Sequence, residues 1–237
     1  MQPGTPSLLM KQAFLYSLKK SLPVLVSFIP VGLAYGILMQ TSGYNWIWTA
    51  GTCVSVFAGS LQFLMVSFFA GGVSLLTVAA MALLLNSRHI FYGIPFIEKW
   101  RGYGPWKYFL IHALPDETFS LHIANDFDDG NERHKKYTYV FSAALVFLYW
   151  TISSVAGALI GRLIRFNTEG IDFALTALFI VILLEQLRGR DARIPALIAL
   201  CSSLTCLVLL GPDRFILPSL MVTVALLLVL QQRRKEA

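Results

Sequence analysis

The chain has 237 residues, of which 56% are hydrophobic and 14% are charged. Soluble domains carry about 25% charged residues, so the composition excludes an ordinary soluble protein and indicates an integral membrane protein. The net charge of +6 does not indicate a nucleic-acid partner, because the basic residues lie in loops and tails, as the orientation rule for membrane proteins expects.

Seven apolar runs are long enough to span a bilayer, which takes about 20 residues in a helix. They lie at about 21–39, 46–69, 73–95, 137–160, 171–187, 194–211 and 213–230. Because short loops join them and leave no room for a soluble core, we predict one integral membrane domain over residues 1–237. The predicted fold class is an all-α, polytopic bundle of seven or eight segments.

The first two runs contain helix-breaking or small residues. Pro23 and Pro30 interrupt the first. In the second, Ala58–Ser60, small residues that permit close packing or a local break, precede Gln62. Such residues are tolerated in membrane helices where neighbouring helices or water satisfy the freed backbone groups. Both helices are therefore predicted to lie in the interior of the bundle.

Residues 107–124 form a doubtful eighth segment. It is apolar at both ends, but Pro115, Asp116 and Glu117 stand in its middle, which favours a broken or re-entrant helix over a lipid-facing one. The basic residues fit an eight-segment model with both termini inside as well as a seven-segment model with the N-terminus outside. We favour eight segments, because three lysines precede the first helix and this helix usually sets the orientation.

Two parts of the sequence resemble each other. Residues 28–45 and 150–167 share small residues and a terminal asparagine, and a long run with a glutamine, Gln62 or Gln186, follows each. Many transporters are built from three-helix repeats with the substrate near the midplane, although apolar segments also resemble each other by chance. A repeat here would be inverted if 107–124 does not span the membrane and parallel if it does.

Asn86, Arg88 and His89 stand near the end of the third run. At a helix end, Arg88 would extend to the headgroups and His89 would lie in the interface. The apolar sequence, however, continues to Pro95, for about two turns, which favours the interior. There Arg88 would bind a carboxylate and His89 would exchange a proton near neutral pH. Asn86, like Gln62, is explained equally well by hydrogen bonds between helices and by substrate contact.

Asp116 and Glu117 have two interpretations. Directly after Pro115 they form a good helix start with negative charge in the first turn, and alternatively they bind substrate or a proton. Adjacent residues point about 100° apart on a helix, so each can do a different job. His112 would share a face with Asp116 on an unbroken helix, an argument that Pro115 weakens.

Together the charged residues predict a transport site. A central Arg or Asp in a membrane helix costs about 2.5 to 3.5 kcal/mol, so ionisable residues persist there where they meet each other or water. We predict that Arg88 and His89 face Asp116 and Glu117 across a polar cavity near the midplane, and that Gln62 contributes to it.

Signatures of catalysis and metal binding are missing from the sequence. Cys53, Cys201 and Cys206 lie in apolar runs without CxxC spacing, which supports neither disulfides nor zinc. Neither HExxH nor GxSxG occurs. We therefore predict no enzyme, metal or cofactor, and an intramembrane hydrolase is kept as the enzymatic alternative.

Four motifs in order, LPVLVSFIPVGLAYG, FAGSLQF, LNSRHIFYG and LPDETFSL, resemble the AzlC family over about residues 21–120. This family comprises the large subunits of bacterial branched-chain amino acid exporters, including the YgaZ-type valine exporters. The family pattern matches here at Pro23, Pro30, Gly36, Ala58, Gly59, Gln62, Arg88, His89, Tyr92, Gly93, Asp116 and Glu117. The position of Asn86 often carries an acidic residue in relatives, which puts a charge-dependent role there in doubt.

The resemblance implies a multi-pass permease of the bacterial inner (plasma) membrane. Such a permease exports valine, leucine, isoleucine or their analogues, coupled to a proton or another ion, and works with a small AzlD-like membrane subunit. A non-transporting assembly subunit is a third class of function. The sequence leaves open the exact substrate, the coupling ion and the direction of transport.

Overall fold

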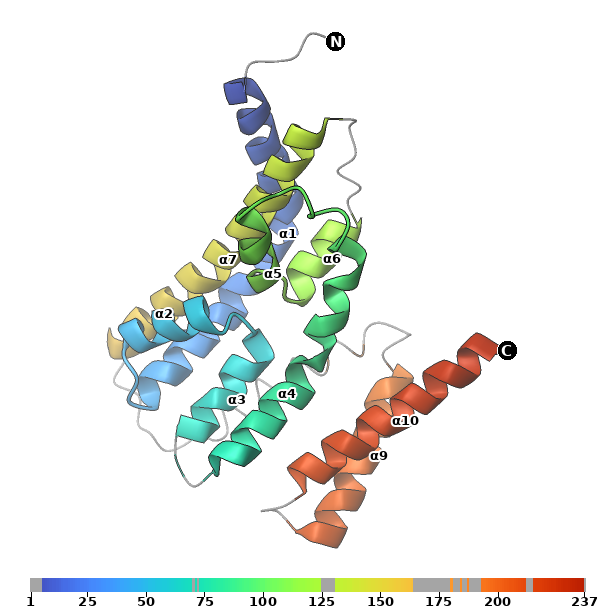
Figure 1. Ribbon diagram of the computed structural model, residues 1–237. Coiled ribbons are helices and arrows are strands. Elements are labelled where there is room, and N and C mark those ends of the chain that lie inside the picture. Colours follow the sequence, from blue (N-terminus) through green and yellow to red (C-terminus); the bar gives the residue numbers. More distant parts are fainter. Residues whose placement is uncertain are drawn as a thin grey trace. The chain divides into compact units, whose positions relative to one another are not determined.

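The computed structural model describes residues 6–69, 71, 73–124, 131–163, 180, 184, 187, 193–211 and 215–236. These residues form helices, turns and short connections, and no β-strand occurs among them. The prediction of an all-α fold is confirmed (Figure 1).

Four helices in the described part of the chain are long and apolar enough to cross a membrane. They are α1 Pro6–Thr41, α4 Leu75–Tyr92, which a short 3-10 helix η1 Ile94–Phe96 extends, α7 Glu132–Leu163 and α9 Arg193–Leu210. They account for the predicted spans 21–39, 73–95, 137–160 and 194–211, and they confirm a multi-pass membrane protein. The span 213–230 lies in α10 Ile216–Glu236, whereas 171–187, with Glu185 and Gln186, lies almost wholly outside the described residues.

Helices α1 and α7 lie side by side and run in the same direction (Figure 1). Near their N-termini, the Ser17 hydroxyl donates a hydrogen bond to the Thr138 carbonyl at 3.1 Å. Farther along, a Cβ added at Gly36 would lie 1.8 Å from the backbone of α7, and one added at Gly157 would lie 2.2 Å from the backbone of α1. Small residues let membrane helices approach this closely, so these glycines form a seam in which the two backbones touch.

The segment predicted to span at 46–69 is instead a hairpin of two short helices, α2 Trp46–Ser55 and α3 Gly59–Phe69. The helix breaks at Phe57, whose φ of 42° is rare for a bulky residue. The Tyr44 hydroxyl donates to the Phe69 carbonyl at 3.2 Å. The two ends of the segment therefore lie at the same end of the bundle. The prediction of a continuous span is wrong there, because each helix covers only about 15 Å.

The doubtful segment 107–124 forms a second hairpin, made of α5 Trp106–His112 and α6 Asp116–Ala124. The ring of His122, near the end of α6, lies 6.0 Å from that of Trp100, which precedes α5. Both ends of this hairpin therefore lie at one end of the bundle. The prediction of a broken or re-entrant segment is confirmed.

The tips of the two hairpins meet beside the middle of α7. Nε2 of His112, at the end of α5, lies 2.8 Å from the Val54 carbonyl oxygen on α2. The rings of Phe57 and His112 lie 4.7 and 6.1 Å from that of Phe147, at the midpoint of the 32-residue α7. Phe147 is also near the middle of the apolar run 137–160 on this helix, and the middle of a spanning run lies near the centre of the bilayer. The tips therefore lie near the midplane.

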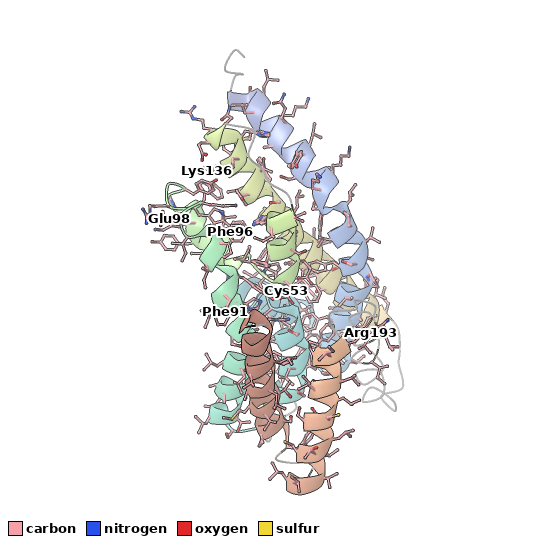
Figure 2. All side chains as sticks on the ribbon, turned by 90° about the vertical axis from the view of Figure 1, so that its right-hand side faces the viewer. Cys53, Phe91, Phe96, Glu98, Lys136 and Arg193 are labelled. Atoms are coloured by element: carbon pink, nitrogen blue, oxygen red, sulfur yellow. The ribbon has the colours of Figure 1, made fainter. Side chains whose placement is uncertain are left out.

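The hairpins enter from opposite ends of the bundle. The base of the first follows the C-terminal end of α1, whereas the base of the second precedes the N-terminal end of the parallel helix α7. At the second base, Phe96 stacks on Trp100 at 4.6 Å, and the Lys136 ammonium lies 5.8 Å from the Tyr103 ring. Figure 2 shows Phe96, Glu98 and Lys136 in this region, an aromatic and basic mixture typical of the membrane interface.

The similar segments 28–45 and 150–167 lie on α1 and α7 as far as the structure describes them. These helices are parallel although 107–124 does not span, because the first hairpin does not span either. The predicted link between an inverted repeat and a non-spanning 107–124 is therefore wrong. That the two segments form a repeat stays a prediction.

The chain divides into two compact units. The first comprises residues 1–71 and 86–168 and contains α1, both hairpins, the C-terminal part of α4, and α7. The second comprises residues 72–85 and 169–237, and in it α9 packs against α10. One domain over residues 1–237 stays a prediction.

Candidate functional site

Charged residues from two of the predicted segments meet in the first unit. Nη1 of Arg88 on α4 lies 2.7 Å from Oδ2 of Asp116 on α6. The Tyr92 hydroxyl donates to the other oxygen, Oδ1, at 2.6 Å, and Nη2 of Arg88 donates to the Ser60 hydroxyl on α3 at 3.0 Å. We call these four residues, Ser60, Arg88, Tyr92 and Asp116, the charged centre.

The local structure explains how these side chains converge. Arg88 and Tyr92 are four residues apart and therefore share one face of α4. Ser60 is the second residue of α3 and Asp116 is the first residue of α6, so both follow directly after a hairpin turn. The charged centre is thus assembled from both hairpin tips and the helix that connects the hairpins.

The centre is partly open. The side chains of Arg88 and Asp116 are each 40% exposed, while Nε of Arg88 is buried without a hydrogen-bond partner among the described residues. Each charge alone would cost about 2.5 to 3.5 kcal/mol at membrane depth, and pairing offsets part of that cost. The geometry leaves donors and acceptors that a charged ligand can reach.

Two further predicted residues adjoin the centre. His89 follows Arg88 on α4, is half-buried, and packs edge-on against Tyr92 with ring centroids 5.5 Å apart. Glu117 follows Asp116, and no described side chain forms a hydrogen bond or ion pair with its carboxylate. The structure therefore brings Arg88 and Asp116 into contact and leaves Glu117 available.

Asn86 lies two residues before Arg88 on α4. Its Oδ1 is buried and has no hydrogen-bond partner within the described part of the chain. The predicted role of Asn86 in substrate binding stays a prediction.

Gln62 has a different environment from the charged residues. It is fully buried, its Oε1 accepts a hydrogen bond from Nε1 of Trp150 at 2.9 Å, and its Nε2 lies 3.4 Å from the Cys53 sulfur. Both ends of the amide are thus engaged between the first hairpin and α7. A contact between Gln62 and substrate stays a prediction.

Asp116 and His112 lie on separate helices. Asp116 starts α6, as the helix-start interpretation predicted, and it also pairs with Arg88. A role of Asp116 in binding substrate or a proton stays a prediction. His112 ends α5 and is bonded to the first hairpin, so the two residues share no helix face.

Two members of the charged centre, Ser60 and Tyr92, were not predicted from the sequence. Ser60 was noted only as a small residue, and Tyr92 only as part of a motif. A signal for Tyr92 was present in its spacing of four residues from Arg88. Nothing local indicated that Ser60 would bind Arg88, because that contact depends on the fold of the first hairpin. Across the described residues, no group of three His, Cys, Asp or Glu is arranged to hold a metal ion.

Comparison with known proteins identifies the family. The family model described as AzlC protein matches residues 23–164. The chain belongs to the AzlC family. The match includes both hairpins and every residue of the charged centre, so the sequence resemblance is confirmed.

Individual relatives agree with this assignment. The "Branched-chain amino acid transport protein AzlC" of Bacillus subtilis (strain 168) is 34% identical, over 95% of this chain and 88% of the relative. An "Uncharacterized membrane protein" of Haemophilus influenzae is 32% identical over 84% and 82% of the two chains. The "Inner membrane protein YgaZ" of Escherichia coli (strain K12) is 25% identical over 76% and 75%. No solved structure matches the chain.

Proposed function

We propose that this AzlC-family protein is the permease subunit of a transporter that exports branched-chain amino acids. The observation that carries the proposal is the charged centre at the meeting point of two hairpins that enter from opposite ends. A charged site at membrane depth is costly, and such residues commonly mark substrate or ion pathways. Transport is therefore a better explanation than an intramembrane hydrolase. The Ser142 hydroxyl does lie 2.9 Å from Nε2 of His122, but both residues are buried, with exposed fractions of 1% and 2%, and neither belongs to the charged centre.

The substrate class follows from the name of the Bacillus relative, an amino acid transport protein at 34% identity. A branched-chain amino acid is a zwitterion with an apolar tail, so its site needs donors, acceptors and an apolar wall. Arg88 supplies donors for the carboxylate, and Asp116 or Glu117 supplies acceptors for the ammonium. Broken helices that present such groups near the midplane are a common design in transporters.

The hairpins also suggest how access alternates. In this proposal, the contact between the tips through His112 and Val54 closes the path past them. Movement of one hairpin would expose the charged centre to one side of the membrane, and movement of the other would expose it to the opposite side. Transporters commonly work by such motion of one element against another around a fixed site.

Two finer features belong to the same proposal. Transport is coupled to a proton or another ion, which His89 or the acidic pair would carry. The chain acts together with a small AzlD-like membrane subunit, which would pack against lipid-exposed helix faces through small residues.

Flux measurements in proteoliposomes test the proposed function. We expect uptake of labelled leucine and valine into vesicles that contain this chain with its small partner, and no uptake of lysine or aspartate. An imposed pH or sodium gradient should change the rate if that ion is coupled. Flux by the partner alone would contradict the proposal and make this chain an assembly subunit, and release of a cleaved product would favour the hydrolase.

A further inference from the structure

A groove of about 530 Å³ lies between α1 and α6 in the first unit. This volume is within the range of about 300 to 1,000 Å³ that is usual for small-molecule sites. The groove is lined by Lys20, Pro23, Val24 and Ser27 on α1 and by Asp116, Glu117, Ser120, Leu121 and Ala124 on α6. It therefore adjoins the charged centre, with which it shares Asp116, but most of its lining has no place in that centre.

The groove runs from one end of the bundle to the midplane. Helix α6 starts at the hairpin tip with Asp116 and ends at the hairpin base with Ala124. Helix α1 is parallel to α7 and runs the opposite way, because its Ser17 lies beside Thr138, near the start of α7. Lys20 therefore lies toward the open end of the groove, and the acidic residues lie at its inner end.

The open end carries most of the described basic residues of the first unit. The parallel arrangement of α1 and α7 brings the N-terminal parts of both helices to the same end, together with Lys11, Lys19, Lys20, Arg133, Lys135 and Lys136. The positive-inside rule assigns such an end to the cytoplasm. The groove then opens toward the cytoplasm, the side from which an exporter must load.

The two carboxylates at the inner end differ in their availability. Both oxygens of Asp116 are engaged, one by Arg88 and one by Tyr92. Glu117 lines the groove, and none of the described side chains binds its carboxylate. Beside it, Pro23, Val24 and Leu121 provide an apolar wall. An acceptor for a cation next to an apolar wall fits an ammonium group attached to a branched hydrocarbon.

We propose that this groove is the loading site of the exporter, in which Glu117 binds the substrate ammonium and Pro23, Val24 and Leu121 contact the branched side chain. The inference rests on the proposed function, because it takes its ligand class from there. Lys20 is the basic residue in the groove lining, and its flexible stem lets its ammonium approach the ligand carboxylate.

Cysteine protection tests the loading site independently of transport. Ser120 is replaced by cysteine in a protein carrying Cys53→Ser, Cys201→Ser and Cys206→Ser. A membrane-impermeant maleimide is then applied to inside-out vesicles, whose cytoplasmic face is exposed. We expect labelling that leucine and 3-methylbutylamine slow, whereas 4-methylpentanoate, which has no ammonium, does not. If Ser120→Cys does not fold, Ser27→Cys reports on the opposite wall.

The decisive variant is Glu117→Gln, which keeps the size of the side chain and removes its charge. It should raise the leucine concentration for half-protection at least tenfold and abolish protection by 3-methylbutylamine. Glu98→Gln is the matched control, because Glu98 is exposed, pairs with Arg101 at 2.7 Å and lies off the groove, and it should protect like the wild type.

The outcomes separate the two proposals. Leucine flux in proteoliposomes without any leucine protection of the groove would overturn the loading site and leave the proposed function standing. Protection that depends on Glu117 without flux would support the loading site and contradict transport. Equal protection by leucine and 4-methylpentanoate would overturn the role of Glu117.

Discussion

The two hairpins share an architecture and differ in chemistry. Each consists of two short helices that turn near the midplane, but the turn of the first carries Phe57, which is 4% exposed, and its nearby amide, Gln62, is satisfied within the protein. The second turn leads directly into Asp116 and Glu117, of which one is paired across to α4 and the other faces a groove. A polar residue in a membrane segment is therefore informative about function only when its own partners are counted.

The different contacts of the two hairpins indicate different roles. The first resembles a plug, because its buried amide, Gln62, is bonded to Trp150 on α7. The second resembles a binding element, because its polar groups reach beyond it.

The largest loss of stability is expected from Gly36→Ala. This glycine lies in the seam between α1 and α7, and the seam holds α7 in place. Helix α2 and both helices of the second hairpin contact α7, so they depend on the same seam. The added methyl would lie 1.8 Å from a backbone oxygen, which no rotamer change can relieve. We expect a loss of about 3 kcal/mol or more and little folded protein by size exclusion in detergent. Gly51→Ala is the control, since no atom lies within 4 Å of its added Cβ. A melting temperature for Gly36→Ala equal to that of Gly51→Ala would contradict the seam.

Neutralising Asp116 in the second hairpin should have the next largest effect. Asp116→Asn removes one member of the pair with Arg88 and leaves the other charge unpaired. The cost should be below the roughly 2 to 5 kcal/mol typical of buried pairs, because both side chains are 40% exposed. We expect leucine flux to fall about 100-fold, which corresponds to roughly 2.7 kcal/mol.

The double variant Arg88→Gln with Asp116→Asn separates stability from function. With both charges gone, no unpaired charge remains, so the melting temperature should recover while the flux stays low. Recovery of flux in the double variant would show that the pair is structural and would remove the contrast between the hairpins.

These residues also show what a sequence can reveal. The ionisable residues of the site could be predicted because a charge within an apolar run can be recognised from the sequence alone. Pro115 likewise marks the break in the second hairpin. The first break was predicted only as an option, since Phe57 is an apolar residue and its left-handed φ is a property of the folded turn. The sequence therefore predicted the members of the ion pair better than the hairpin that brings Ser60 to it.

The contacts of Gln62 could not be predicted either. Its bond to Trp150 joins residues 88 positions apart, and it depends on how the first hairpin packs against α7. From the sequence, a buried structural glutamine and a substrate-binding glutamine look the same.

Replacing Gln62 by leucine tests whether the buried amide of the first hairpin has a structural role. The change leaves the Trp150 indole nitrogen without its acceptor, and a buried unsatisfied donor costs about 1 to 3 kcal/mol. We expect a lower melting temperature, whereas leucine flux per folded molecule should stay within about threefold of the wild type. A fall in flux as large as that of Asp116→Asn, at unchanged stability, would make Gln62 a substrate contact and give both hairpins the same role.

The smallest effect is expected where the hairpins touch. A bond to the Val54 carbonyl requires that Nε2 of His112 carries the proton, and the 2.8 Å distance is that of an ordinary hydrogen bond, worth about 0.5 to 1.5 kcal/mol. His112→Ala should therefore lower the melting temperature by only roughly 2 to 4 °C. His112→Gln, whose Nε2 can donate in nearly the same place, should restore it, and Tyr108→Ala on the exposed face of α5 should have no effect. If the contact between the tips closes the path, His112→Ala should also increase maleimide labelling of cysteines placed at the charged centre, whereas unchanged labelling would mean that the tips do not control access.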